Sequence, residues 1–173
     1  GQANLYNYNY WSSPVGNLST TTNNNTFSVN SVMRDGTDPM NPLNLDWTTG
    51  YDSSATIPIT LSTYWIFKFQ NLTPIYANWT YAGPNGSFFA SQGFTMKGSS
   101  SEGSTQNYIF TGKPNNGEIL SPVAANNGNL SGNPYPSAID ANAFITANTV
   151  STTGAIYFWE HYPSNTSHIL IEY

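Results

Sequence analysis

Apolar and aromatic residues recur at every second position along several short stretches of the chain. Between Asn4 and Trp11, for example, Tyr6, Tyr8 and Tyr10 alternate with other side chains. A period of two is typical of a β-strand with one buried face. On this basis strands are predicted at residues 4–11, 27–34, 64–69, 75–81, 94–97, 108–110, 155–161 and 168–173.

One stretch follows the period of a helix instead, and it predicts a short helix around residues 137–147. Pro134 and Pro136 exclude regular structure just before it, because neither has a backbone N–H group to donate. Ser137 is expected to accept hydrogen bonds from the first helical turn. Asp140 is expected to place its carboxylate near the positive end of the helix.

A long stretch after the second predicted strand, residues 35–54, is interrupted by Gly36, Pro39, Pro42 and Gly50. This punctuation predicts a loop. Three apolar side chains are expected to tie the loop to the core, namely Leu43, Leu45 and Trp47. Loops of this length are uncommon unless they carry a function or pack as compact excursions.

About nine short strands and one helix predict an all-β fold, specifically a jelly-roll-like β-sandwich with the helix at an edge or an end. A barrel is the alternative. The length of 173 residues suits one domain with a sizeable core, so residues 1–173 are predicted to form a single module. No stop signal follows the last predicted strand, and the module is expected to be a piece of a larger multidomain surface protein.

The composition narrows the classes of partner. Only 8% of the residues are charged and the net charge is −5, so the chain has no basic stripe for nucleic acid or for an anionic membrane. No apolar run is long enough for a membrane span. Aromatic residues make up 15% of the chain, which argues against disorder. Because the chain has no cysteine, it forms neither disulfides nor thiolate metal sites. A β-rich chain with so few charged residues favours an extracellular, bacterial-surface setting.

Five motifs occur in a fixed order along the chain. They are YNYWSSPV at residues 8–15, GFTMKG at 93–98, GKPNNG at 112–117, GNPYPSA at 132–138 and YFWEH at 157–161. This series resembles a module of large secreted and cell-surface proteins of Bacteroidota, flavobacteria especially. The resemblance implies export, by type IX secretion, and a non-catalytic role in adhesion or as a scaffold between neighbouring domains. It implies no ligand-binding residues.

Exposed aromatic rings beside amides and carboxylates are what glycan binding uses, because the ring faces pack on sugar C–H groups. Trp11, Trp47, Tyr51 and Trp79 are therefore the candidate residues for carbohydrate binding, with Tyr81 beside them. The alternative is that the tryptophans fill the core between two sheets, and most of the five are expected to do so. Trp47 and Tyr51, in the predicted loop, are the ones expected to face solvent.

The same loop contains four aspartates, and three of them, Asp35, Asp38 and Asp46, are the candidate ligands for a metal ion. Calcium prefers several oxygen ligands supplied by a turning loop, although the spacing here is not that of an EF-hand. The preferred interpretation is that Asp35 and Asp38 close turns by accepting hydrogen bonds from their own backbone. No cofactor is predicted, and calcium is the one that the sequence leaves open.

Catalysis is not predicted. His161 and His168 are the only histidines, and neither a nucleophile elbow nor a zinc-protease motif is present. Glu160 and His161 are neighbours on one predicted strand, so their side chains point to opposite faces. The chain is accordingly expected to be a non-enzymatic adhesion or scaffold module, with a carbohydrate-binding module as the alternative. Its expected partners are neighbouring domains, surface glycans and other surface proteins.

Overall fold

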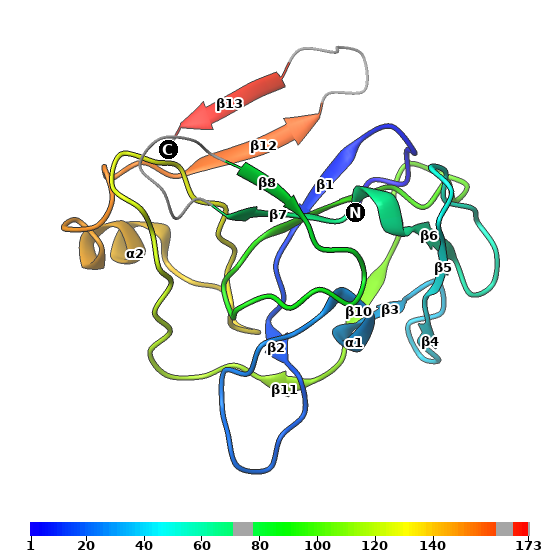
Figure 1. The fold of residues 1–173 in the computed structure, drawn as a ribbon, viewed down its shortest axis with the longest axis horizontal. Coiled ribbons are helices and arrows are strands. Elements are labelled where there is room, and N and C mark those ends of the chain that lie inside the picture. The colour runs from blue at the N-terminus through cyan, green and yellow to red at the C-terminus, as the bar shows by residue number, and fades with distance from the viewer. Residues whose placement is uncertain (71–77, 162–167, 173) are drawn as a thin grey trace. The chain divides into compact units, whose positions relative to one another are not determined.

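Short strands make up most of the regular structure in the described part of the chain, which comprises residues 1–70, 78–161 and 168–172 of a computed structural model (Figure 1). The predicted all-β fold class is confirmed. The chain divides into two compact units, Gly1–Pro136 and Ser137–Tyr173, and each is described by itself below. That residues 1–173 act as one module stays a prediction.

The first unit contains a four-stranded antiparallel sheet. Its strands, in order across the sheet, are β1 (Tyr8–Trp11), β9 (Phe94–Lys97), β7 (Phe67–Gln70) and β8 (Asn78–Tyr81). Tyr8 lies opposite Lys97, and Phe69 lies opposite Trp79. The two halves of the sheet are joined where Lys68 pairs with Phe94.

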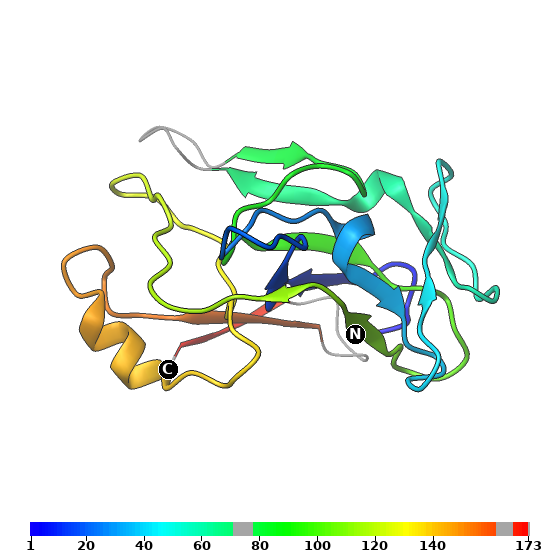
Figure 2. The same cartoon turned by 90° about the horizontal axis from the view of Figure 1, so that it is seen from below.

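A second, three-stranded antiparallel sheet orders β10 (Tyr108–Phe110), β3 (Met33–Asp35) and β4 (Leu43–Asn44). Two short pairs complete the unit. They are β2 (Val15–Gly16) with β11 (Lys113–Pro114), which run antiparallel, and β5 (Asp46–Thr48) with β6 (Thr60–Ser62), which run parallel. Figure 2 shows β7 and β8 running side by side, and the short helix α1 next to β3.

The core of this unit takes side chains from both larger sheets, such as Met96 on β9 and Met33 on β3. At its centre Phe27, Phe88 and Phe94 pack ring against ring, with Phe27 and Phe88 stacked at 5.3 Å between centroids. The other buried members are Val15, Val29, Val32, Leu45, Ile59, Leu61 and Ile66. A layer of phenylalanine and aliphatic side chains therefore holds the two sheets together.

The prediction that most of the tryptophans fill this core is wrong for the four whose side chains are described. Trp11, Trp47 and Trp65 are only partly buried, with the first two packed against the core cluster, and Trp79 is exposed. An indole N–H group needs a hydrogen-bond partner when it is buried, and phenylalanine and aliphatic side chains do not. The side chain of Trp159 lies outside the described residues.

The predicted strand over 27–34 is wrong in its middle. Val29–Val32 form the short helix α1, and only Met33–Asp35 continue as a strand. Ser28 accepts a hydrogen bond from the backbone N–H of Ser31, and the Ser31 side chain accepts one from the backbone N–H of Ser28. This reciprocal capping box begins a helix where the apolar alternation alone indicates a strand.

Two further predictions need correction. The strand predicted at 64–69 begins only at Phe67, three residues later than predicted, because Thr63–Trp65 form the 3-10 helix η1 before β7. The predicted loop over 35–54 contains β4 and β5, and Leu45 between them is buried as expected, whereas Leu43 is exposed. The strand predicted at 75–81 is described only from residue 78, and residues 75–77 lie outside the description.

The second unit has the predicted helix followed by a pair of strands. The helix, α2, spans Ala141–Ala147, and Asp140 rather than Ser137 is its N-cap, because the Asp140 carboxylate accepts a hydrogen bond from the backbone N–H of Ala143. The strands β12 (Tyr157–His161) and β13 (His168–Glu172) pair antiparallel, and the predicted connection between them lies outside the described residues. None of the helices in the described segments has the length and apolar character needed to cross a membrane.

Candidate functional site

One face of the four-stranded sheet is lined with aromatic rings. Residues directly opposite each other on paired strands share a face. Because Tyr8 faces Lys97 and Tyr10 faces Thr95, these four lie together, on the side opposite Phe94 and the core. The rings on this side, here called the aromatic face, are Tyr8, Tyr10, Phe67, Phe69, Trp79 and Tyr81.

The rings of the aromatic face contact one another across the sheet. Phe69 and Trp79 lie 5.1 Å apart between centroids, and Phe67 and Tyr81 lie 5.8 Å apart. Tyr10 on β1 and Trp79 on β8 come within 5.9 Å, although their strands are the two edges of the sheet. Trp79 remains 45% exposed. Tyr10 and Tyr81 are also exposed, and adjoining exposed rings of this kind usually mark an interaction surface.

A second group of rings adjoins one end of this face. Tyr51 and Tyr64 lie 4.7 Å apart and Tyr64 and Trp65 lie 4.6 Å apart between centroids, with both pairs near perpendicular. Trp65 also meets Tyr8 edge-on at 6.0 Å. We call Tyr8, Tyr51, Tyr64 and Trp65 the ring cluster. Tyr51 and Tyr64 are 63% and 44% exposed, so two rings meet at an open corner.

Local hydrogen bonds hold the ring cluster in place. Ser62 caps η1 by accepting from the backbone N–H of Tyr64, and its hydroxyl donates to the Gly50 carbonyl at 2.6 Å. The Trp65 indole N–H donates to the Tyr51 carbonyl, also at 2.6 Å. The segment that carries Tyr51 is therefore tied to η1 at two points, and the corner between the rings is preformed.

Lys97 is the cation of this surface. Its Nζ atom lies 3.5 Å from the centroid of the Trp65 ring and 5.2 Å from that of Tyr8, which is cation–π geometry. Partial burial lowers the pKa of Lys97, and the Asp52 carboxylate acts in the opposite direction. Burial likewise raises the pKa of Tyr8 and of Tyr10. The site thus offers ring faces together with one ammonium and one carboxylate.

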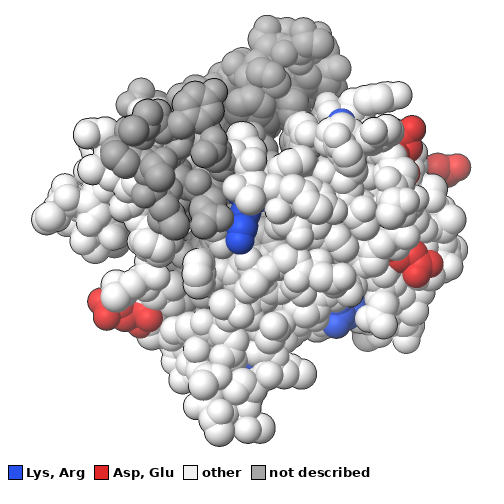
Figure 3. All heavy atoms as spheres, viewed as in Figure 1, with Lys and Arg blue, Asp and Glu red and all other residues white. Residues whose placement is uncertain are grey.

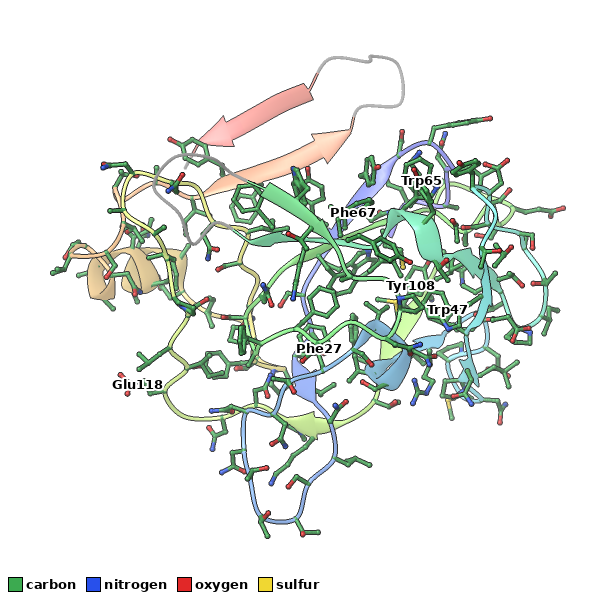
Figure 4. The ribbon with its side chains drawn as sticks, in the orientation of Figure 1. Phe27, Trp47, Trp65, Phe67, Tyr108 and Glu118 are labelled. Carbon is green, nitrogen blue, oxygen red and sulfur yellow. The ribbon has the colours of Figure 1, made fainter. Side chains whose placement is uncertain are left out.

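The candidates for carbohydrate binding are only partly brought together. Tyr51 belongs to the ring cluster and Trp79 to the aromatic face. Trp47, predicted to face solvent, is half-buried instead, and its Nε1 atom donates to the Asn30 side chain at 3.0 Å. Trp11 packs edge-on against Tyr108 on the core side. Figure 4 shows Trp47 apart from Trp65.

Sequence reasoning missed Tyr64, Trp65 and Lys97 as members of a site. It placed Tyr64 and Trp65 on opposite faces of one strand, where they could not meet on one surface. In the 3-10 helix their rings are neighbours instead. The signal that was available is Ser62, which is a favourable cap residue just before them.

The three candidate calcium ligands do not converge. Asp35 is buried, and its carboxylate accepts hydrogen bonds from Thr37, from the Ile59 backbone N–H at 3.0 Å and from Gln106. Asp38 is exposed and closes a turn, and hydrogen bonds from Asn41 and Met40 lower the pKa of its carboxyl. Asp46 is exposed on β5. In the described ranges no three His, Cys, Asp or Glu side chains gather where a metal ion could bind.

The basic side chains outside the site are engaged with backbone carbonyls. Arg34 donates to the carbonyls of Asn30, Ser31 and Met33, Lys113 donates to those of Ser19 and Thr22, and Lys68 donates to that of Ser87. In the view of Figure 3 the charged atoms are few and separated by uncharged surface. This arrangement gives a polyanion no continuous track.

The two histidines lie opposite each other in the β12–β13 pair, and their side chains lie outside the described residues. The absence of catalysis stays a prediction.

Tyr108 provides a pH-dependent prediction, because it is largely buried beside the core. Burial raises the pKa of its hydroxyl well above 10.0, and the nearby Asp35 carboxylate raises it further. Above pH 10 the unfolded chain loses this proton while the folded chain keeps it, so stability falls by about 1.4 kcal/mol per pH unit for this group. Tyr108→Phe is expected to make the free energy of unfolding fall less steeply between pH 10 and 11, because the variant lacks the one proton that unfolding releases from Tyr108. Urea unfolding at each pH measures it, and equal slopes for the two proteins would contradict it.

Comparisons with known proteins give one match. Neither the curated proteins nor the solved structures contain a match to this chain. A family model described as a domain of unknown function, DUF8693, matches residues 45–171, which is more than half of the chain. The chain therefore belongs to the DUF8693 family.

Proposed function

We propose that this chain is a non-catalytic, extracellular adhesion module of a bacterial cell-surface or secreted protein, and that it adheres by binding carbohydrate at the ring cluster. It stands beside neighbouring domains of a longer polypeptide that is exported by type IX secretion. The resemblance of its five motifs to Bacteroidota surface modules supports the location and the export route. The low charge and the lack of cysteine agree with that setting.

The observation that carries the proposal is the open corner of the ring cluster. Tyr51 and Tyr64 stand nearly perpendicular, at 81°, and both are substantially exposed. One ring face can pack on the C–H face of a sugar while the second ring closes its edge. Lys97 and the two tyrosine hydroxyls supply hydrogen bonds to sugar hydroxyls. Few precisely placed polar groups beside apolar rings are the usual composition of a small-ligand site.

A scaffold role without a ligand is the competing function. It would use the chain as a spacer between neighbouring domains, and it requires no exposed rings. The ring cluster favours carbohydrate binding over this alternative, because the tethering of Tyr51 to η1 fixes the rings before any ligand arrives.

The test is a depletion assay with insoluble polysaccharides, namely cellulose, chitin, xylan, mannan and β-1,3-glucan. The full chain is expected to bind at least one of them. Tyr51→Ala and Tyr64→Ala are each expected to weaken that binding about tenfold, since each removes a ring from the corner. Tyr6→Ala is the matched control, because Tyr6 is 77% exposed and belongs to neither group of rings.

Melting temperatures of all variants separate lost binding from lost folding. The proposal fails if the chain binds none of the five polysaccharides. It also fails if folded Tyr51→Ala and Tyr64→Ala bind as well as Tyr6→Ala does.

A further inference from the structure

We infer that the ring cluster and the aromatic face form one continuous binding site for an extended, uncharged polysaccharide chain rather than for a single terminal sugar. The inference rests on the proposed function and adds the class of ligand to it. It depends on three features of the first unit. These are the continuity of the rings, the charge of the surface around them, and the distribution of polar and apolar side chains on that surface.

The rings are continuous along β1. Tyr8 contacts Trp65 of the ring cluster, and Tyr10 contacts Trp79 of the aromatic face. Tyr8 and Tyr10 are two residues apart on the same side of one strand, a rise of about 7 Å. Trp79, on the edge strand β8, then contacts Phe69 on the inner strand β7. A ligand bound at the open corner can therefore extend over Trp79 without leaving aromatic surface.

The charge of the surface favours an uncharged ligand. Lys97 is the one basic residue beside the rings, and the Asp52 carboxylate acts on it. The other three basic residues of the chain, Arg34, Lys68 and Lys113, donate to backbone carbonyls. Recognition of a uronate or sulfated polymer uses several basic side chains along the ligand. A neutral polymer of hexoses or pentoses needs none.

The distribution of polar and apolar side chains favours an extended saccharide over a single sugar as the ligand. Thr95, the polar residue at the middle of the face, is buried, and its hydroxyl is engaged with the carbonyl of Trp65. The aromatic face therefore offers ring surface, with the hydroxyls of Tyr10 and Tyr81 at its exposed rings, to sugar units beyond the one held at the ring cluster. Since stacking adds with each ring covered, affinity is expected to grow with the length of the ligand.

The test is a titration of the full chain with oligosaccharides of two and six units, followed by tryptophan fluorescence and calorimetry. The ligands are cello-, manno-, xylo-, laminari- and chito-oligosaccharides. The hexasaccharide of the recognised series is expected to bind at least tenfold more tightly than the disaccharide. Trp79→Ala is expected to weaken hexasaccharide binding far more than disaccharide binding, and so to remove most of that difference. Tyr51→Ala is expected to weaken both, and Tyr6→Ala neither.

Several results would overturn the inference while leaving the proposed function standing. These are equal affinity for the two lengths, or a folded Trp79→Ala protein that still prefers the hexasaccharide. Tighter binding of oligogalacturonate than of every neutral series, weakened severalfold between 0.05 and 1 M NaCl, would overturn the uncharged class of ligand. If no oligosaccharide binds and the insoluble polysaccharides are not bound either, the proposed function falls as well.

Discussion

Replacing Asp35 by alanine is expected to lower the free energy of unfolding by about 3–5 kcal/mol. The buried carboxylate accepts hydrogen bonds from the backbone N–H of Ile59, from Thr37 and from Gln106. Alanine leaves at least two of these donors without an acceptor, and each such buried donor costs about 1–3 kcal/mol. Asp35→Asn is expected to cost less, because its carbonyl oxygen keeps one of the bonds.

Urea unfolding followed by tryptophan fluorescence measures the change. Asp38→Ala is the matched control, because Asp38 is an aspartate of the same segment that is exposed and accepts hydrogen bonds within its own turn. A much smaller loss is expected there. Equal losses for the two alanine variants would show that the buried network around Asp35 does not join residues 35–37 to Ile59 and Gln106 as described.

Phe88→Ala is expected to destabilise the protein by about 3–5 kcal/mol, the usual cost of removing a phenylalanine ring from a packed core. Phe88 is fully buried, stacks on Phe27 at 5.3 Å and contacts Phe94 at the same distance between centroids. Its backbone also pairs with that of Phe27 in both directions, at 2.8 and 2.9 Å. The cavity would lie at the centre of the first unit.

The next residue supplies the control. Phe89 is 58% exposed, so Phe89→Ala is expected to change the free energy of unfolding by less than about 1 kcal/mol. The two proteins have the same composition and differ only in which of the adjoining rings is removed. Thermal and urea unfolding of both measure the difference, and similar destabilisation of the two would contradict the assignment of Phe88 to the core.

The alternation of apolar residues predicts the all-β class, and it locates β9 and β10 well. Of the strand predicted at residues 4–11, only Tyr8–Trp11 form β1. The alternation fails as a predictor where a serine side chain accepts a hydrogen bond from a nearby backbone N–H group. Ser28 and Ser31 turn an alternating segment into α1, and Ser62 does the same for η1. In both places a local cap outweighs the period of the apolar residues, and a serine just before the segment was the available signal.

The sequence predicts that the candidate site is built from aromatic rings, but it identifies only some of the residues that form it. Tyr51 and Trp79 are candidates from the sequence, and they lie in the ring cluster and on the aromatic face, respectively. Trp11 and Trp47 are candidates as well, but they pack against the core. Sequence spacing does not show which rings meet across strands, because Tyr10 and Trp79 come together only through the order of the four-stranded sheet.

The matched family span begins at residue 45, yet much of the first unit's interior comes from before it. Val15, Phe27, Val29, Val32 and Met33 all belong to the buried cluster, and β1 pairs with β9 along its whole length. The span 45–171 therefore does not contain a complete hydrophobic interior of its own. In this chain the first compact unit, residues 1–136, therefore begins upstream of the span that the family model matches.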